Sequence, residues 1–173
     1  MSNTRLMTII GIVVFAAASR LLPHLPNISP IAAVALFGGA MLSGRRTAFV
    51  IPLAAMFLSD LFLGFHRQLP VVYLCFLATV AMGRLLAERR SPLSVAAAAL
   101  ASSLLFFVVT NFSVWAFDGL YPQTLAGFTT CFVAALPFFQ HSLVGDLSYT
   151  IALFGGFSLL TRWIPALREP LLA

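Results

Sequence analysis

The chain has 173 residues, of which 61% are hydrophobic and only 9% are charged. Its ten basic residues, all arginine, exceed its five acidic residues and give a net charge of +5. These arginines lie between apolar stretches, where they set membrane topology, so the charge does not indicate nucleic-acid binding. Several apolar stretches approach the roughly 20 residues that span a bilayer as a helix. We therefore predict an all-α, polytopic membrane protein.

Six transmembrane helices are predicted within one membrane-embedded domain that covers residues 1–173. In chain order they are expected over residues 6–22, 30–43, 47–64, 70–86, 93–117 and 138–162. The first stretch also resembles a secretory signal with a cleavage site after small residues, but its apolar run continues to Leu22, which favours a retained helix. The second predicted helix is too short for a hydrocarbon core of about 30 Å. We expect it to border a cavity.

The stretch between the last two predicted helices contains an apolar segment, Thr124 to Leu136, that is too short to cross a bilayer. We interpret it as a re-entrant or interfacial segment that could cover an outward-facing site. The last helix is expected to start after Pro137. His141 and Asp146 then lie near a helix start, where capping and solvation explain them.

The arginines predict the orientation of the chain. With both termini in the cytoplasm, eight arginines lie inside and only Arg20 and Arg67 lie outside. The sequence contains no P-loop or other nucleotide-binding motif. Energy for transport, if it is needed, would therefore come from another protein.

Polar and aromatic residues gather at the predicted outward ends of the helices. They are Arg20, His24, Asn27, Asp60, His66, Arg67, Tyr73, Cys75, Asn111, Trp115, Asp118 and Tyr121. Because polar groups in a membrane are costly, each one either pairs within the bundle or marks a site. Rings with a few amides and acids are typical of a substrate pocket. For Asp60, pairing with Arg20 or Arg67 and contact with a substrate both remain open.

Two single cysteines, Cys75 and Cys131, are far apart in the sequence and form no CxxC motif, so neither a disulfide framework nor a sulfur-rich metal site is indicated. Cys131 is expected to pack in an apolar environment. Cys75 has two interpretations, a small buried hydrophobic residue or a soft ligand for a metal centre, including one carried inside a cofactor. The histidines show no metal-ligand spacing.

Three segments and a cysteine carry a resemblance to a known family. Residues 20–27 (RLLPHLPN), 58–66 (LSDLFLGFH) and 110–115 (TNFSVW), the last followed by Tyr121-Pro122, resemble the BtuM family, and Tyr73-Leu74-Cys75 fits members whose cysteine faces cobalt. That family consists of small proteins implicated in vitamin B12 uptake and related to the substrate-binding S-components of energy-coupling-factor (ECF) vitamin transporters. The resemblance runs from about Arg20 to Phe157. The six short helices with polar outward loops are also similar to S-components.

The resemblance implies a six-helix S-component-like bundle in a bacterial inner membrane that binds cobalamin in an outward-facing pocket. It implies Cys75 as the axial cobalt ligand, acting on a base-off corrinoid and able to promote loss of a cyano ligand. The implied substrate-binding residues are His24, Asp60, Tyr73, Asn111, Trp115 and Tyr121. An ECF-type energising module is an implied partner, although transport by the chain alone is equally compatible with the sequence.

Three alternatives remain open from the sequence. The chain could be an S-component for another small vitamin or a metal, in which case Cys75 is incidental. It could be an intramembrane thiol oxidoreductase that uses Cys75 and Cys131, although such chemistry usually needs paired cysteines. It could also be a structural subunit of a larger complex, which would leave the clustered polar residues unexplained.

Overall fold

The computed structural model describes residues 2–22, 28–88 and 90–168, and within these ranges it is entirely helical, without strands. The all-α prediction is therefore confirmed. The elements are α1 (Asn3–Ala18), η1 (Ser19–Leu21), α2 (Ile31–Met41), α3 (Arg45–Leu63), α4 (Leu69–Leu85), α5 (Pro92–Phe117), α6 (Leu125–Thr150), the π-helical turn η2 (Ile151–Gly155), α7 (Gly156–Trp163) and η3 (Pro165–Leu167).

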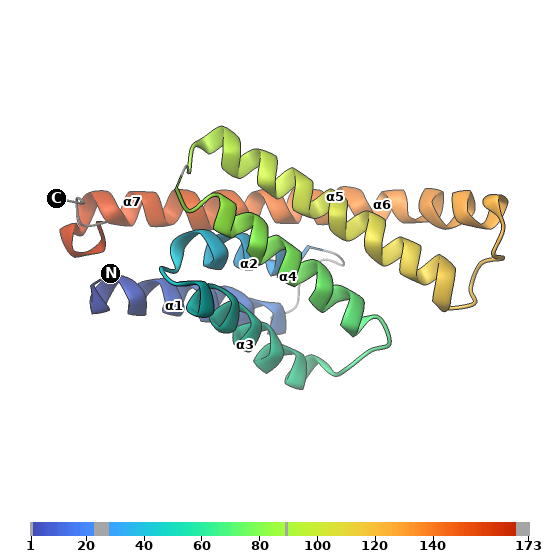
Figure 1. The fold of residues 1–173 in the computed structure, drawn as a ribbon, viewed down its shortest axis with the longest axis horizontal. Coiled ribbons are helices and arrows are strands. Elements are labelled where there is room, and N and C mark those ends of the chain that lie inside the picture. The colour runs from blue at the N-terminus through green and yellow to red at the C-terminus, as the bar shows by residue number, and fades with distance from the viewer. Residues whose placement is uncertain (1, 23–27, 89, 169–173) are drawn as a thin grey trace.

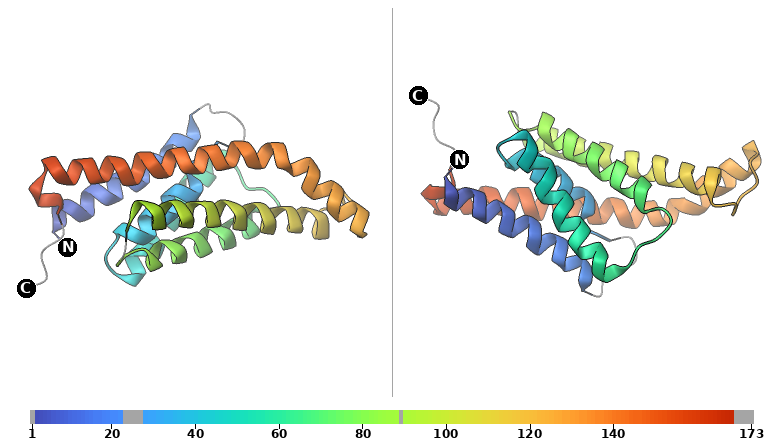
Figure 2. Two further views of the ribbon diagram at one scale, coloured as in Figure 1. Left: turned by 90° about the horizontal axis from the view of Figure 1, so that it is seen from above. Right: turned by 60° about the horizontal axis from the view of Figure 1, so that its bottom comes forward.

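The helices run back and forth along the long axis of the molecule. In Figure 1, α1 begins and α7 ends at the same end, and the other views in Figure 2 agree. Four segments of the described chain are long and apolar enough to cross a membrane: Asn3–Leu21, Arg45–Leu63, Pro92–Phe117 and Leu125–Trp163. The helices α2 and α4 are apolar but have only 11 and 17 residues. A count of six membrane spans therefore stays a prediction.

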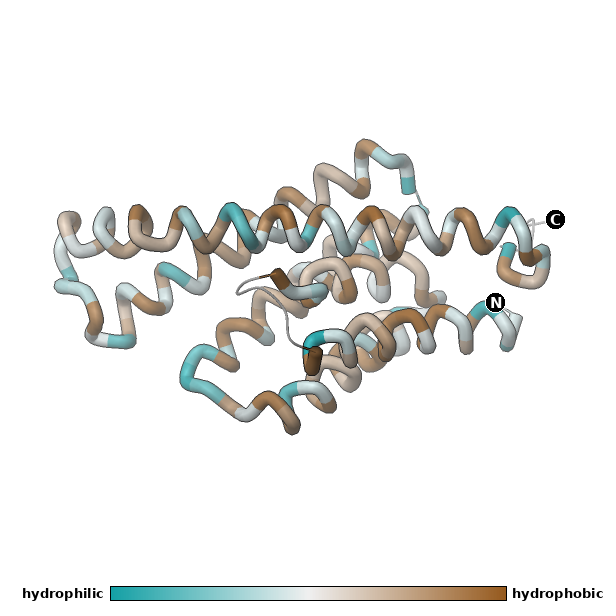
Figure 3. The backbone as a smooth tube through the Cα atoms, turned by 180° about the vertical axis from the view of Figure 1, so that it is seen from behind, coloured by the Kyte–Doolittle hydropathy of each residue, from teal (hydrophilic) through white to brown (hydrophobic). Residues whose placement is uncertain are grey.

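The outer surface of the helices is apolar. Large hydrophobic side chains such as Phe15, Phe62 and Leu85 are each more than three-quarters exposed. Figure 3 shows hydrophobic residues distributed along the helices, while hydrophilic residues gather at places such as the turn between α3 and α4. An apolar surface of this extent is unfavourable in water and is compatible with contact to lipid chains.

The short helix α2 forms the centre of the bundle. Nine of its eleven residues, Ala32 to Ala40, are buried. It crosses α4 at two glycines, because a Cβ atom added to Gly39 would collide with the Val80 carbonyl and one added to Gly83 would collide with the Leu36 carbonyl. Such small residues allow two helix backbones to approach closely. This helix was predicted to border a cavity. Most of its residues pack in the core, and Met41 at its end lines the large cavity described below.

The prediction for the segment from Thr124 to Leu136 was wrong. This segment is the first half of α6, which continues without a break past Pro137 and through the π-helical turn into α7. Thr124 caps the helix by accepting a hydrogen bond from the Gly127 amide at 3.1 Å. Proline is tolerated inside such a helix because it removes only one backbone hydrogen bond, which neighbouring groups compensate in membrane bundles.

The continuous helix formed by α6, η2 and α7 is longer than a bilayer requires and places His141 and Asp146 away from a helix start. Its 39 residues correspond to about 58 Å of rise, well beyond a hydrocarbon core of about 30 Å. The α5–α6 hairpin accordingly projects beyond the other helices in Figure 1. His141 and Asp146 lie in the interior of α6 and not at a helix start. Helix-start capping therefore does not explain them.

Candidate substrate-binding site

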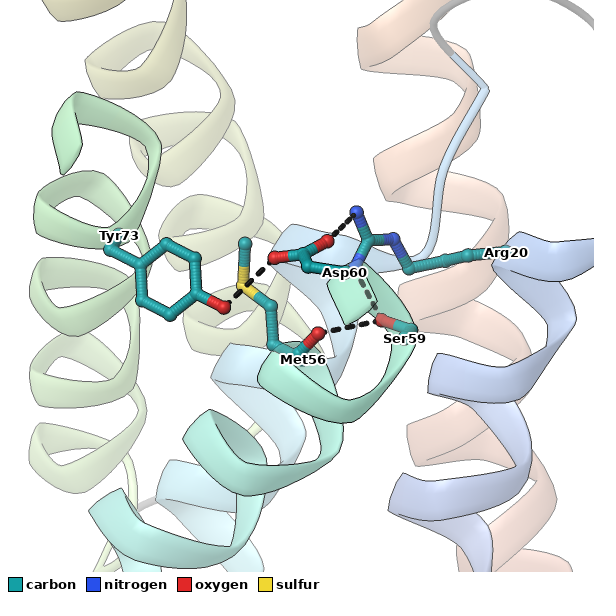
Figure 4. Close-up of polar contacts among 5 residues, drawn as sticks. All are labelled: Arg20, Met56, Ser59, Asp60 and Tyr73. Atoms are coloured by element: carbon teal, nitrogen blue, oxygen red, sulfur yellow. Dashed lines mark hydrogen bonds and ion pairs between the residues drawn. The ribbon is translucent and has the colours of Figure 1, made fainter. Parts of the chain in front are cut away.

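A buried polar network, drawn in Figure 4, joins three elements at the end of α1 that lies away from the chain termini in Figure 1. Asp60 of α3 accepts from both sides: its Oδ1 lies 2.8 Å from Nη2 of Arg20, in η1, and its Oδ2 accepts the Tyr73 hydroxyl, from α4, at 2.8 Å. Arg20 also donates through Nη1 to the Ser59 hydroxyl at 2.6 Å, and Ser59 donates to the Met56 carbonyl at 2.7 Å. The network therefore joins η1, which directly follows α1, to α3 and α4.

The carboxylate at the centre of this network is almost completely buried. Asp60 is only 2% exposed. A buried carboxylate needs a charge partner and hydrogen bonds to offset its desolvation, and Arg20 with Tyr73 supplies both. Of the two partners considered for Asp60, Arg20 is the one found. Arg67 instead lies 3.6 Å from Oδ1 of Asp118 and is largely exposed.

Cys75 faces the interior of the bundle. Its side chain is on α4 and the residue is only 2% exposed, so it does not lie on the outer surface of the bundle. It follows Tyr73 by two residues, which is about 200° around the helix, so the thiol and the Tyr73 hydroxyl lie on different faces of α4. Neither of the two cavities described here, the large one below and a pocket of about 10 Å³ beside Arg20, is lined by Cys75.

The predicted residues of the α5–α6 hairpin stabilise the hairpin itself. Asn111 donates to the Phe107 carbonyl of its own helix at 2.7 Å. Trp115 donates from Nε1 to the Pro122 carbonyl at 3.0 Å, and its ring meets Phe128 edge-on at 5.4 Å. Tyr121 lies half-buried in the turn. These contacts assign Asn111 and Trp115 structural roles, and their predicted contact with a substrate stays untested.

The hairpin is nevertheless connected to the same end of the bundle as the Asp60 network. Gln68, which precedes α4, donates to Oδ2 of Asp118 at 2.7 Å, and Arg67 donates to the Phe117 carbonyl at 2.7 Å. These two hydrogen bonds join the turn between α3 and α4 to the end of α5. His66 lies exposed in the turn between α3 and α4. His24 and Asn27, predicted for the same end, lie outside the described residues, as does Arg89.

Cys131 is buried, as expected for a packing residue, but it lies on α6 and not in a loop segment. Its Sγ lies 3.5 Å from the Asn111 carbonyl oxygen, so it packs against α5. Both cysteines are free thiols. Within the described ranges, no group of three or more histidine, cysteine or acidic residues is placed to hold a metal ion.

One buried carboxylate was not assigned to a site from the sequence. Asp146 of α6 is 8% exposed and accepts the Ser103 hydroxyl, from α5, at 2.6 Å. An acidic residue within an apolar span is itself a signal of a functional or paired group. The identity of its partner depends on how α5 and α6 are rotated against each other, which the sequence does not specify.

The large cavity lies at the other end of the bundle. It encloses about 660 Å³ between the starts of α1 and α5, the end of α2 and the π-helical turn of the last long helix. It is lined by Arg5, Met41, Arg90, Pro92, Val95, Ala96, Leu147, Thr150, Ile151, Phe154, Gly155, Phe157, Ser158, Thr161 and Arg168. The sequence predicted a pocket only at the opposite end, so this cavity is a separate feature.

Comparison with known proteins gives one family. No curated protein matches the chain, and no solved structure matches it. The profile of one family, described as "Family of unknown function (DUF6580)", matches residues 1–167, which is nearly the whole chain. The chain therefore belongs to the DUF6580 family.

Proposed function

We propose that this chain is a membrane-embedded uptake protein whose substrate is cobalamin. The proposal includes a bilayer location in the bacterial inner membrane, six membrane spans with α2 and α4 counted among them, and both termini in the cytoplasm. Its support is the apolar helical bundle, the arginine distribution and the resemblance of three sequence segments to the BtuM family. The central observation is the interior position of Cys75 on α4.

Cys75 is the proposed axial ligand of the cobalt. A thiolate is a soft donor, and a corrinoid cobalt in its base-off form has an axial position for it. In this step the sulfur would donate an electron pair to cobalt and the thiol would give up its proton. Cyanide would leave with its own bonding pair and take up that proton as hydrogen cyanide, so no electron is transferred to or from the metal. Loss of cyanide makes slow decyanation part of the proposal.

The substrate would enter from the end that carries the Asp60 network. His24, Asp60, Tyr73, Asn111, Trp115 and Tyr121 are the proposed contacts to the corrin ring and its amides. Asp60 and Tyr73 already satisfy each other, so substrate contact would require Tyr73 or the α5–α6 hairpin to move. An ECF-type energising module is the proposed partner for that change in exposure.

A second candidate is favoured by one observation. Neither described cavity is lined by Cys75, whereas the cavity of about 660 Å³ has the size typical of small-molecule sites, about 300–1,000 Å³. An S-component-like protein for a different, smaller vitamin would not need Cys75. Its substrate would bind the Cys75→Ser variant and the unchanged protein equally well.

The experiment that tests the proposal is binding of cobalamin by the purified protein. We expect the detergent-solubilised protein to retain about one corrinoid per chain after gel filtration, and cells that lack their own cobalamin importer to grow at low cobalamin when they express it. Cys131→Ser is the matched control, because it replaces the other buried thiol, and it should bind normally. A protein that retains no corrinoid and supports no growth would overturn the proposal.

A further inference from the structure

Asp146 is a buried carboxyl group that the proposed cobalamin site does not use. It lies in the interior of α6, within the apolar segment Leu125–Trp163, and is only 8% exposed. The Ser103 hydroxyl of α5 donates to its Oδ2 at 2.6 Å. The same hydroxyl lies 3.0 Å from the Ala99 carbonyl, so its single proton is shared between two acceptor oxygens. Asp146 therefore receives one neutral and shared donor.

Asp60 shows how a buried carboxylate is compensated elsewhere in this molecule. It has the Arg20 guanidinium at 2.8 Å and the Tyr73 hydroxyl at 2.8 Å. Within the described ranges, Asp146 has neither an ion pair nor a second hydrogen bond. An ionised Asp146 would therefore be a charge without a described counter-ion inside an apolar bundle, which is unfavourable.

The helices packed against Asp146 offer no charge to balance it. α6 packs against α5 and α2, and neither helix contains an acidic residue, arginine, histidine, cysteine or tyrosine. Gly145 lies against residues 28 and 29, which carry no titratable side chain either. The titratable residues nearest to Asp146 on α6 itself are His141, which is exposed, and Tyr149, which is half-buried.

A carboxyl group in such surroundings is most stable when it holds a proton. Burial without a counter-ion disfavours the charged form of an acid, which takes up a proton instead. The neutral acid keeps its contact with Ser103 through Oδ2. The proton then resides on Oδ1, which has no hydrogen bond to a described residue. The neutral form thus needs no rearrangement of the helices.

The large cavity gives this proton a route to water. Of the two cavities described above, it alone is lined by residues of the last long helix, among them Leu147 and Thr150. Thr150 follows Asp146 by four residues, about 6 Å of helix rise. It is 4% exposed and its Oγ1 has no hydrogen-bond partner among the described residues, so this hydroxyl can bond a water molecule that passes between the cavity and the carboxyl group.

We propose that Asp146 is a proton-binding site inside the bundle, which holds the neutral carboxylic acid in this structure and exchanges its proton through the large cavity. Proton release would leave a negative charge between α5 and α6, so the two helices would have to admit water or separate locally. The π-helical turn Ile151–Gly155 lies directly beyond Thr150, and such turns are frequent at functional sites. Acids of this kind within membrane helices recur in proton-coupled proteins.

Dicyclohexylcarbodiimide, an apolar reagent for protonated carboxyl groups, tests for the proton. The carboxyl proton moves to a nitrogen of the carbodiimide and the carboxylate oxygen bonds to its central carbon, so the adduct keeps every atom of both reactants. The full-length protein in phosphatidylcholine vesicles is treated at neutral pH, and peptide mass spectrometry locates the adduct. We expect at least about five times more adduct at Asp146 than at Asp60, which is paired with Arg20. An unlabelled Asp146, or labelling of Asp60 to the same extent, would overturn the proposal.

Two other ways of compensating Asp146 give different results in the same assay. A sodium ion bound to the carboxylate would compete with the reagent, so sodium chloride but not choline chloride would protect it. An ion pair with His24, which lies outside the described residues, would keep Asp146 unlabelled until His24→Gln removes the histidine. Either result would overturn proton binding. Asp118→Asn is the control, because the partner Arg67 is 72% exposed, and it should leave the labelling of Asp146 unchanged.

Infrared spectroscopy detects the same proton without a reagent. A neutral carboxylic acid has a C=O stretching band that is separate from the bands of an ionised carboxylate. We expect this band at neutral pH in the unchanged protein and in Asp118→Asn, and its loss in Asp146→Asn. A band that persists in Asp146→Asn, or one that is absent from the unchanged protein, would contradict the assignment.

Two adjacent glycines provide a matched pair that tests the route of exchange. Gly155 lines the cavity and Gly156 does not, and a Cβ atom added to either would meet no atom within 4 Å. In heavy water the carboxylic acid band shifts as deuterium replaces the proton. Gly155→Leu should slow this shift at least about threefold, whereas Gly156→Leu should leave its rate unchanged. Equal rates in both variants would overturn the cavity route.

A further variant keeps the test of the route valid if leucine at position 155 prevents folding. Thr150→Val removes only the hydroxyl between the cavity and Asp146, and it should also slow the deuterium shift. An unchanged rate in a folded Thr150→Val variant would overturn the role of this hydroxyl. Because these assays use no corrinoid and do not involve Cys75, their failure would leave the cobalamin proposal unaffected.

Discussion

Arg20 and Asp60 form an ion pair with a distance of 2.8 Å between Nη2 and Oδ1, and it joins the end of the first helix to α3. Both side chains are largely buried, with 12% and 3% exposure. Removing one partner of a buried pair leaves the other charge uncompensated. This pair is therefore expected to contribute to the relative placement of α1, α3 and α4.

The Asp60→Asn variant should be strongly destabilised. The amide keeps the size of the side chain but leaves the Arg20 charge without a counter-ion, and a loss of about 3 kcal/mol in the free energy of unfolding is expected. Denaturant unfolding of the detergent-solubilised protein measures it. Asp118→Asn is the control, because its partner Arg67 is 72% exposed and the contact is 3.6 Å long, so a loss below about 1 kcal/mol is expected. Equal losses in both variants would contradict the assignment.

The Tyr73→Phe variant isolates one hydrogen bond of the same network. It removes only the hydroxyl that donates to Asp60 at 2.8 Å. Hydrogen bonds to charged groups contribute about 1.5–3 kcal/mol, so a loss of about 2 kcal/mol in unfolding free energy is expected. Tyr121→Phe should change stability little, because no described hydrogen bond involves the Tyr121 hydroxyl. A loss from Tyr121→Phe as large as from Tyr73→Phe would show that the Asp60 contact is not the cause.

The crossing of α2 and α4 should not tolerate added methyl groups. Gly39→Ala and Gly83→Ala each place a Cβ atom against a backbone carbonyl of the opposite helix, so a loss of about 2 kcal/mol or more is expected from overpacking. Gly11→Ala, in α1, meets no atom within 4 Å and should stabilise the protein by up to about 1 kcal/mol through helix propensity. Thermal unfolding midpoints compare the three variants. Similar midpoints for all three would argue against the close crossing.

Two buried hydroxyls on neighbouring helices should respond in opposite ways. Thr150→Val removes a hydroxyl without a described partner and should be neutral or stabilising by up to about 1 kcal/mol. Ser103→Ala leaves the buried Asp146 carboxylate without its 2.6 Å donor and should destabilise by about 2 kcal/mol. Chemical denaturation of both variants checks the contrast. A destabilised Thr150→Val variant would mean that its hydroxyl has a stabilising partner.

The first five helices could be predicted from the sequence to within about one helical turn. Prolines, glycines and arginines mark where the apolar stretches begin and end, for example at Gly44-Arg45 and Ser91-Pro92. The last long helix could not be delimited this way. Pro137 looked like a helix start, but in this helix it is an interior residue, and the actual start is the Thr124 cap.

The polar contacts of the site could be predicted only in part, because they depend on how neighbouring helices are rotated against each other. A buried carboxylate such as Asp60 is recognisable because it is costly in an apolar span, and Arg20 was one of its two candidate partners. The Ser103–Asp146 contact and the large cavity depend on the rotation of α5 against the last helix and on the π-helical turn. A pattern of hydrophobic residues fixes which face of a helix is buried, but not which polar residue it meets across the interface.

The proposed binding of a corrinoid cobalt by Cys75 is tested most directly by a visible absorption spectrum. The spectrum is recorded for the protein purified from cells supplied with cyanocobalamin, beside the Cys75→Ser and Cys131→Ser variants. We predict a bound corrinoid whose spectrum is shifted from that of free cyanocobalamin in the unchanged protein and in Cys131→Ser, and not in Cys75→Ser. A colourless protein, or the same spectrum in all three, would contradict it.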